Sequence, residues 1–146
     1  MVPLTVTELE QEAKEVRHEV VKMIYEAGSG HPGGSLSSID ILVALFFGGV
    51  LFYNFRDPKN EKRDRFILSC GHVCQAYYAV LAKAGFFDVS FLSGLRDLGN
   101  PLQGHPSSIF ANFIETSTGS LGQGLSVAVG IALGLKCKGS ERQRCK

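Results

Sequence analysis

Apolar residues recur at three- and four-residue steps near the start of the chain, which predicts an amphipathic helix. Charged residues such as Glu12 and Arg17 fall between them and are left for solvent. Thr7 and Glu10 have the spacing of a capping box, so we expect the helix to begin there, and Gly28 supplies its stop. The apolar repeat consists of Leu9, Ala13, Val16, Val20, Met23, Ile24 and Ala27.

Further helices are expected along the chain. The segment from about 35–38 to 47 is apolar on nearly every side, which predicts a helix buried on most of its surface. Another helix is expected over about 74–84, and a last one from near 119–122 to about 136. Between these two, a short amphipathic turn should point four side chains inward: Phe91, Leu92, Leu95 and Leu98.

One short segment has the pattern of a strand. Residues 65–69 are apolar after Arg65 and bounded by turn signals, which is typical of a buried parallel strand. Because helices flank it, the predicted fold class is α/β, a parallel sheet flanked by helices. A single strand makes no sheet, so we expect residues 1–146 to be the incomplete N-terminal portion of a larger domain. Its tail, about 137–146, is expected to be divergent and irregular.

Composition and charge exclude several classes of protein. The chain has 146 residues, 45% of them hydrophobic and 20% charged, which suits one folded domain rather than a disordered segment. The net charge of +1 gives no field to hold nucleic acid or an anionic membrane. We see no signal peptide and no membrane span, and so expect a cytoplasmic protein. The 4 cysteines lack paired zinc-site spacing and are expected to be reduced thiols.

Two loops share the local pattern Gly-His-Pro, at 30–32 and at 104–106. The proline pushes the preceding histidine toward extended backbone, and the glycine allows a sharp turn or a close ligand. A neutral imidazole offers one donor and one acceptor and can gain a proton near pH 7. His31 and His105 are therefore candidates for binding sugar hydroxyls and moving protons. The alternative is that both are loop histidines without a role.

His72 lies just beyond the carboxyl end of the predicted strand, where ligands bind in open α/β sheets. The start of a helix there favours an anion. Alternatively, His72 only fills the corner between strand and helix. The turn 116–124 is rich in hydroxyls and glycines, and its backbone donors suit a polar ligand, although it is neither a P-loop nor a dinucleotide fingerprint. The glycines that follow suit close helix packing, and His18 lies on the polar side of the first helix.

Taken in order, these motifs resemble the start of transketolases, most of all the N-terminal subunit of split transketolases. The resemblance covers about residues 8 to 136. Related 1-deoxyxylulose-phosphate synthases share a histidine element but not the pair of Gly-His-Pro turns. The motifs are Gly28-Ser29-Gly30-His31-Pro32-Gly33-Gly34, Asp64-Arg65-Phe66-Ile67-Leu68-Ser69-Cys70-Gly71-His72, Gln103-Gly104-His105-Pro106 and Glu115-Thr116-Ser117-Thr118-Gly119-Ser120-Leu121-Gly122-Gln123-Gly124.

The resemblance implies a thiamine diphosphate site and the transfer of a two-carbon ketol unit from a ketose phosphate to an aldose phosphate. His72 matches the histidine that contacts the diphosphate of the cofactor. His31 and His105 match histidines that line the substrate channel and bind ketose hydroxyls. The segment whose backbone contacts the aminopyrimidine end of the cofactor matches Gly119, Ser120 and Leu121.

The resemblance also implies parts that we do not find in residues 1–146. In the family a strand leading into Gly-Asp-Gly, with a later asparagine, holds Mg²⁺ on the diphosphate, and a second domain binds the pyrimidine. We therefore expect no metal ligands, a truncated chain that is inactive alone, and a homo-oligomer or a hetero-oligomer with a C-terminal transketolase subunit. The alternative is a non-catalytic remnant or interaction module of the same fold. A ketoacid-processing enzyme of the same cofactor class fits the doubled Gly-His-Pro less well.

Overall fold

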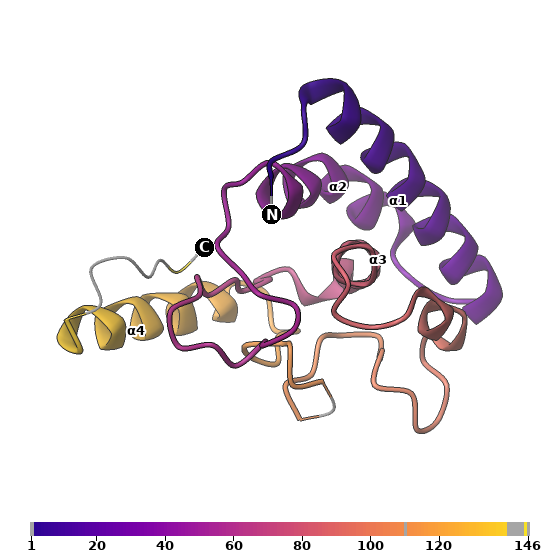
Figure 1. Ribbon diagram of the computed structural model, residues 1–146. Coiled ribbons are helices and arrows are strands. Elements are labelled where there is room, and N and C mark those ends of the chain that lie inside the picture. Colours follow the sequence, from indigo (N-terminus) through magenta and orange to yellow (C-terminus); the bar gives the residue numbers. More distant parts are fainter. Residues whose placement is uncertain (1, 110, 140–144, 146) are drawn as a thin grey trace.

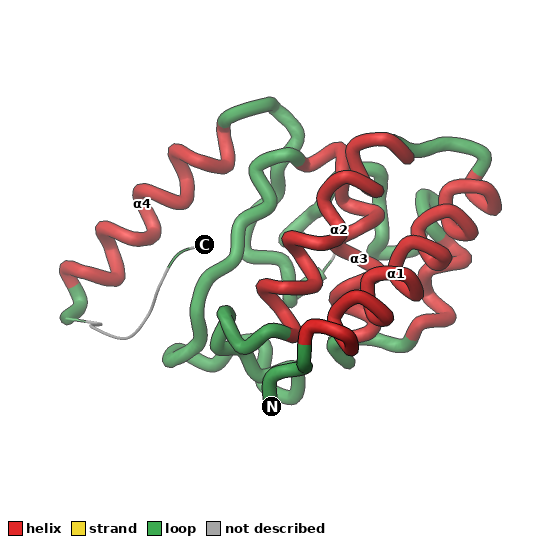
Figure 2. The backbone as a smooth tube through the Cα atoms, turned by 90° about the horizontal axis from the view of Figure 1, so that it is seen from above, coloured by secondary structure: helices red, strands yellow, loops and turns green. Residues whose placement is uncertain are grey.

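The structure is a computed structural model that describes residues 2–109, 111–139 and 145. Helices α1, α2 and α3 pack on one another, whereas α4 extends to one side (Figure 1). The view from above shows the same separation, with loop segments lying between α4 and the other helices (Figure 2). In chain order the elements are α1 (Val6–Ala27), α2 (Pro32–Phe47), the 3-10 helix η1 (Gly71–Val73), α3 (Cys74–Lys83), the 3-10 helix η2 (Val89–Gly94) and α4 (Gln123–Cys137).

α1 begins earlier than its sequence predicts. Thr5 is the N-cap: its extended backbone (φ −68°, ψ 164°) allows its hydroxyl to accept from the Glu8 N–H, while Glu8 accepts from the Thr5 N–H at 2.7 Å. The capping box expected at Thr7 and Glu10 is therefore wrong, because Thr7 already lies inside the helix. The stop at Gly28 is confirmed, since this residue adopts the left-handed conformation (φ 62°).

α3 lies at the centre of the hydrophobic core. All its residues from Cys74 to Ala82 are buried, and α1 and α2 each turn one apolar face toward it. The predicted repeat of α1 is confirmed, with Ala13, Val16, Val20 and Met23 buried. The expectation for α2 is only partly right: its inner face is buried, but Ile41 is 66% exposed because it lies on the side away from α1 and α3. The buried side chains of α2 are Ser35, Ile39, Leu42, Val43, Phe46 and Phe47.

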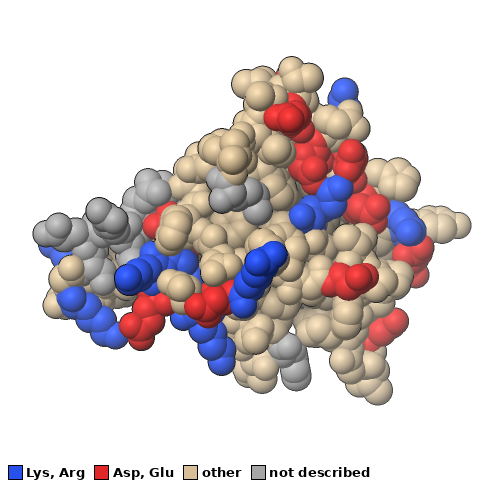
Figure 3. Space-filling view, in the orientation of Figure 1, with Lys and Arg blue, Asp and Glu red and all other residues tan. Residues whose placement is uncertain are grey.

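Charged side chains of both signs are interspersed on the face seen in Figure 3, over α1 and over the loop on the opposite side. On α1 and α3, Lys83 Nζ lies 2.5 Å from Glu15 Oε2 and 3.4 Å from Glu12 Oε1. The mixture agrees with the small net charge of +1. In the described part of the chain, no helix combines the length and apolar character needed to cross a bilayer. The cysteines Cys70, Cys74, Cys137 and Cys145 are free thiols.

The segment 65–69 does not pair as a full strand within the described residues. Arg65 forms an isolated parallel bridge with Cys145, and residues 66–68 have no ladder partner. A segment forms a strand only where the backbone N–H and C=O groups of a neighbouring strand pair with its own. Here one of these groups is paired with a side chain instead, because the Thr118 hydroxyl donates to the Leu68 carbonyl at 2.6 Å. The sheet that the sequence predicts is therefore absent from the described residues, most of whose regular structure is helical.

Two further expectations meet mixed outcomes. In and just after η2, Leu92 and Leu95 are buried as predicted, but Phe91 and Leu98 are exposed, at 48% and 106%. The three-residue repeat of a 3-10 helix brings positions 92 and 95 to one face and leaves 91 off it. Leu98 lies beyond η2, which ends at Gly94. At the other end of the chain, the tail prediction falls on residues of which 140–144 and 146 lie outside the described part, while Cys137 is still helical.

α4 carries an exposed apolar stripe. In α4 the structure buries only Gly124, whose Cα leaves no room for a side chain: an added Cβ would lie 2.6 Å from the Ser69 Cα. Apolar side chains at four-residue steps, from Leu121 just before α4 onward, stay in solvent. The stripe consists of Leu121, Leu125, Val129 and Leu133, which are 73%, 66%, 51% and 58% exposed.

We predict that the chain expressed alone self-associates or is poorly soluble, because a contiguous apolar stripe of this kind is uncommon on monomers. The double variant Leu125→Glu and Val129→Glu should shift the population toward monomer, as measured by sedimentation velocity. Val21→Glu is the matched control, since Val21 is 53% exposed on α1, away from the stripe. A wild-type chain that is monodisperse and monomeric, or a control that acts like the double variant, would contradict the prediction.

Candidate functional site

The candidate histidines come from segments far apart in sequence and meet in space. His31 is the N-cap of α2, His72 lies in η1, and His105 lies in the loop before residue 111. The ring centroid of His31 lies 5.5 Å from that of His72 and 6.5 Å from that of His105. His31 and His105 are exposed and His72 is half-buried. In contrast, His18 lies on α1 with its side chain 79% exposed, as predicted.

The glycine-rich turn reaches the same place. A Cβ added to Gly71 would lie 2.5 Å from the Thr118 carbonyl oxygen and 2.9 Å from the Gly119 nitrogen. Likewise, a Cβ on Gly119 would lie 3.3 Å from Cδ2 of His105. Gly71 therefore permits two backbones to touch and Gly119 permits the His105 ring to approach the turn, which brings His72, His105 and the turn together. Ser120 and Leu121 follow in the exposed part of the turn.

Two side chains of α3 hold the loop that carries His105. The Cys74 thiol donates to the Gly104 carbonyl at 3.2 Å, and the Tyr78 hydroxyl donates to the Gln103 carbonyl at 3.0 Å. Burial raises the pKa of Cys74 to about 12, so the thiol keeps its proton and remains a donor. Neither residue was predicted from the sequence to belong to the site. Their spacing of four on the helix that follows His72 was the available signal, because it places them on one face.

Arg96 is a further residue beside the histidines that was not predicted from the sequence. Its Nη1 donates to the Ser29 hydroxyl at 3.0 Å, and its guanidinium lies beside Gly104, just before His105. The pKa of His105 is lowered from its usual value, first by partial desolvation and then by His31, Arg96 and His72. The imidazole of His105 is thus neutral at pH 7 and offers both a donor and an acceptor.

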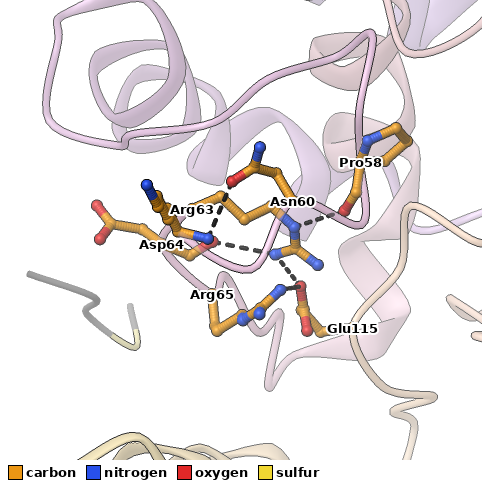
Figure 4. Close-up of polar contacts among 7 residues, drawn as sticks. Pro58, Asn60, Arg63, Asp64, Arg65 and Glu115 are labelled. Atoms are coloured by element: carbon orange, nitrogen blue, oxygen red, sulfur yellow. Dashed lines mark hydrogen bonds and ion pairs between the residues drawn. The ribbon is translucent and has the colours of Figure 1, made fainter. Parts of the chain in front are cut away.

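An ion-pair cluster fixes the segments that lead to this site (Figure 4). The guanidinium of Arg63 contacts the Glu115 carboxylate, and Arg65 Nη1 lies 3.6 Å from the same oxygen. Arg63 also donates to the backbone carbonyls of Pro58 and Asp64. Together with the hydrogen bond from Thr118 to the Leu68 carbonyl, these contacts hold residues 63–71 against 115–119.

The residues of the chain match a known family over nearly its whole length. The family described as "Transketolase, thiamine diphosphate binding domain" matches residues 9–144. The chain belongs to this family. The resemblance inferred from the histidine and glycine motifs is therefore confirmed, and so is thiamine diphosphate as the cofactor of the family.

Named relatives and solved structures agree with this assignment. The chain is 40% identical over 133 residues to one subunit of the apulose-4-phosphate transketolase of Phocaeicola vulgatus, covering 91% of this chain and 47% of that subunit. It is 42% identical to the transketolase of Homo sapiens over 85% of this chain and 20% of that enzyme. The crystal structure of transketolase from Campylobacter jejuni superposes with a TM-score of 0.83 at 33% identity, over 91% of this chain and 21% of that chain. The chain thus spans about half the length of the Phocaeicola vulgatus relative.

The described residues of this transketolase-family chain fit the polar ends of thiamine diphosphate. Gly34 packs closely against η1 next to His72, because an added Cβ would lie 2.8 Å from the Val73 side chain and 3.6 Å from the His72 ring. An imidazole N–H and the backbone N–H groups of a glycine-rich turn are donors that suit a diphosphate and a ring nitrogen. Among residues 2–109, 111–139 and 145, no group of three or more His, Cys, Asp or Glu is arranged to hold a metal ion.

We predict that Glu115→Gln destabilises the fold by roughly 2–3 kcal/mol. Removing one partner of a buried ion pair leaves the other charge unpaired, which costs about 3–5 kcal/mol when burial is complete, and here the side chains of Arg63, Arg65 and Glu115 are 13%, 16% and 15% exposed. The measurement is the free energy of unfolding from urea denaturation followed by circular dichroism.

Asp40→Asn is the matched control for this prediction. Asp40 pairs with Arg17 at 2.6 Å, but their side chains are 70% and 37% exposed, so its loss should cost less than about 1 kcal/mol. Equal losses for the two variants would show that the cluster around Glu115 is an ordinary surface pair.

Proposed function

We propose that this chain is the thiamine diphosphate-binding part of a transketolase that moves a two-carbon ketol unit from a ketose phosphate to an aldose phosphate. The observation that supports the proposal is the meeting of His31, His72 and His105 beside the turn at Thr118–Gly119. Two relatives are, by their names, subunits of apulose-4-phosphate transketolases, and a third belongs to a 6-deoxy-6-sulfo-D-fructose transketolase. Sugar phosphates are accordingly the proposed substrate class.

His72 and the turn are the proposed cofactor ligands. His72 donates an N–H to the diphosphate, and the backbone of Gly119, Ser120 and Leu121 holds the aminopyrimidine end. The contact of Gly71 with Thr118–Gly119 supports this pairing, because it fixes the turn next to His72. In the assembled enzyme, residues 65–69 form a strand of a parallel sheet, for which the parallel bridge of Arg65 is the supporting feature.

His31 and His105 are the proposed substrate ligands. When bound, thiamine diphosphate supplies the electron sink that carbon–carbon bond cleavage needs. The ring centroids of the two imidazoles are 6.5 Å apart, so the two rings can reach neighbouring hydroxyls of one ketose. Since the pKa of His105 is lowered, its ring is neutral at pH 7 and offers one nitrogen that can accept a hydroxyl proton and one N–H that donates a hydrogen bond.

The proposed partner is a second polypeptide. The chain covers about half the length of the apulose-4-phosphate transketolase subunits that it matches, but only a fifth of the human enzyme. A pyrimidine-binding subunit would complete the enzyme, and we expect the chain alone to show no ketol transfer. A second candidate function, a non-catalytic interaction module of the same fold, is favoured by one observation, the exposed stripe of α4.

The test is a graft into a complete enzyme. This chain replaces the matched part of the Phocaeicola vulgatus subunit, which is then assembled with its partner. Circular dichroism and sedimentation first establish that the graft is folded and assembled. Thiamine diphosphate binding is measured by calorimetry and ketol transfer by product formation.

In this graft, His72→Ala should weaken cofactor binding on the order of ten- to a hundredfold, the range expected for a hydrogen bond to a charged group. His31→Ala and His105→Ala should leave cofactor binding in place and lower kcat/KM by on the order of a hundredfold, as for lost proton-transfer groups. His18→Ala is the control and should change neither quantity. A folded, assembled graft without cofactor binding or transfer would favour the interaction module instead.

A further inference from the structure

Arg96 has a backbone conformation that arginine disfavours. Its φ is 70°, and it is the sole non-glycine residue with positive φ in the part of the chain that the structure describes. In this left-handed region the Cβ crowds the following carbonyl, and glycine alone adopts it freely. The Arg96 N–H donates to the Leu102 carbonyl at 2.9 Å, which closes the loop 96–102. Glycine would close this loop with less strain, so the side chain at position 96 must offset an unfavourable backbone.

The side chain of Arg96 lies between the two Gly-His-Pro turns. Its Nη1 is 3.0 Å from the Ser29 hydroxyl, two residues before His31. Its Nε and Nη2 lie 3.0 Å from the point where a Cβ on Gly104 would stand, one residue before His105. A side chain at position 104 would thus collide with the guanidinium. The two turns are far apart in sequence, and Arg96 touches both.

One donor of this guanidinium is unsatisfied. Arg96 Nε is buried and has no hydrogen-bond partner among the described residues. Buried polar groups are nearly always paired, so an orphaned donor is costly and calls for a reason. Strain at φ and an orphaned Nε are two separate costs at one residue. Local packing of the loop 96–102 explains neither, because glycine avoids both.

We propose that Arg96 is a positioning residue that spans the two Gly-His-Pro turns and thereby sets the spacing of His31 and His105. The proposal rests on the substrate-binding role proposed above for these histidines. The planar, forked guanidinium suits this task, because it can hydrogen-bond Ser29 at one edge while its plane packs on the Gly104 backbone. Lysine has one ammonium group and cannot contact both turns in this way.

The charge of Arg96 gives the proposal a measurable signature. The titratable and charged groups around His105 are His31, His72 and Arg96. The Cys74 thiol also lies near Arg96, but its pKa of about 12 keeps it neutral. A fixed cation beside His105 disfavours its protonated form and lowers its pKa. Removing the cation should therefore raise the pKa of His105, and opening the turn should raise it further by exposing the ring.

The experiment is an NMR titration of the histidine ring protons in the full chain carrying Leu125→Glu and Val129→Glu, so that it does not depend on the cofactor, the substrate or activity. Arg96→Gly is the main variant, since glycine fits φ 70°. We expect the pKa of His105 to rise toward its usual value. We also expect weaker nuclear Overhauser cross-peaks between the ring protons of His31 and His105. The urea midpoint should stay the same or increase, because backbone strain is relieved.

Arg96→Lys and Arg56→Gly complete the design. Lysine keeps the charge but not the fork, so the pKa of His105 should stay low while the cross-peaks weaken. Arg56 lies in an exposed loop, so Arg56→Gly controls for the loss of one positive charge. This variant should change neither the pKa of His105 nor the cross-peaks between the two rings. If Arg96→Gly leaves both the titration and the cross-peaks as in the parent chain, the proposal is overturned; if it fails to fold, strong cross-peaks in Arg96→Lys overturn it. A graft without ketol transfer would refute the proposed function and leave these ring measurements standing.

Discussion

The close approach of two backbones, at Gly71 and at Thr118–Gly119, is the constraint on which the site depends. No side chain fits between them, since an added Cβ would lie 2.5 Å from a carbonyl oxygen. This contact places the segment before α3 directly against the turn before α4. As a result, His72 and His105 lie on either side of the same turn. The ion pairs of Glu115 and the hydroxyl of Thr118 act on the same two segments. Loss of any of these contacts loosens the same junction.

α3 connects this junction to the core. It is buried over almost its whole length, and it begins at Cys74, two residues after His72. From this helix Cys74 and Tyr78 hold carbonyls of the loop that carries His105. The loop of His105 is therefore exposed at the histidine but anchored to a helix that is buried from Cys74 to Ala82. Such an arrangement combines access for a ligand with a rigid support.

Much of the helical architecture could be predicted because its signals are local, whereas the assignment of the site residues rests on the resemblance to the family and stays a prediction. The periodic apolar positions of α1 and the two Gly-His-Pro turns are readable in short windows, and Gly28 is a direct helix stop. α2 starts earlier than predicted, although Pro32 at the first helical position was a usable signal. The predicted capping box is wrong because the same Thr-x-x-Glu spacing occurs at Thr5–Glu8.

Other features could not be predicted from the sequence because they depend on distant neighbours. Whether residues 65–69 pair as a strand is decided by what lies beside them, not by their own pattern. Arg96 carries no motif, and only its contacts with Ser29 and Gly104 reveal it. The outward turn of Leu98 follows from the local path of the chain at Arg96, which apolar periodicity does not encode.

The position of the turn at 115–121 late in the chain has a consequence for the order of events during synthesis. Helices α1, α2 and α3 precede it, and they contact one another without it. As the polypeptide leaves the ribosome, these helices can form their shared core first, since domains assemble from the N-terminus as synthesis proceeds. His31 and His72 can thus take their places on this core before Gly119 is synthesised and packs against Gly71. The proposed cofactor-binding turn therefore joins the fold only after the core of α1, α2 and α3 can form.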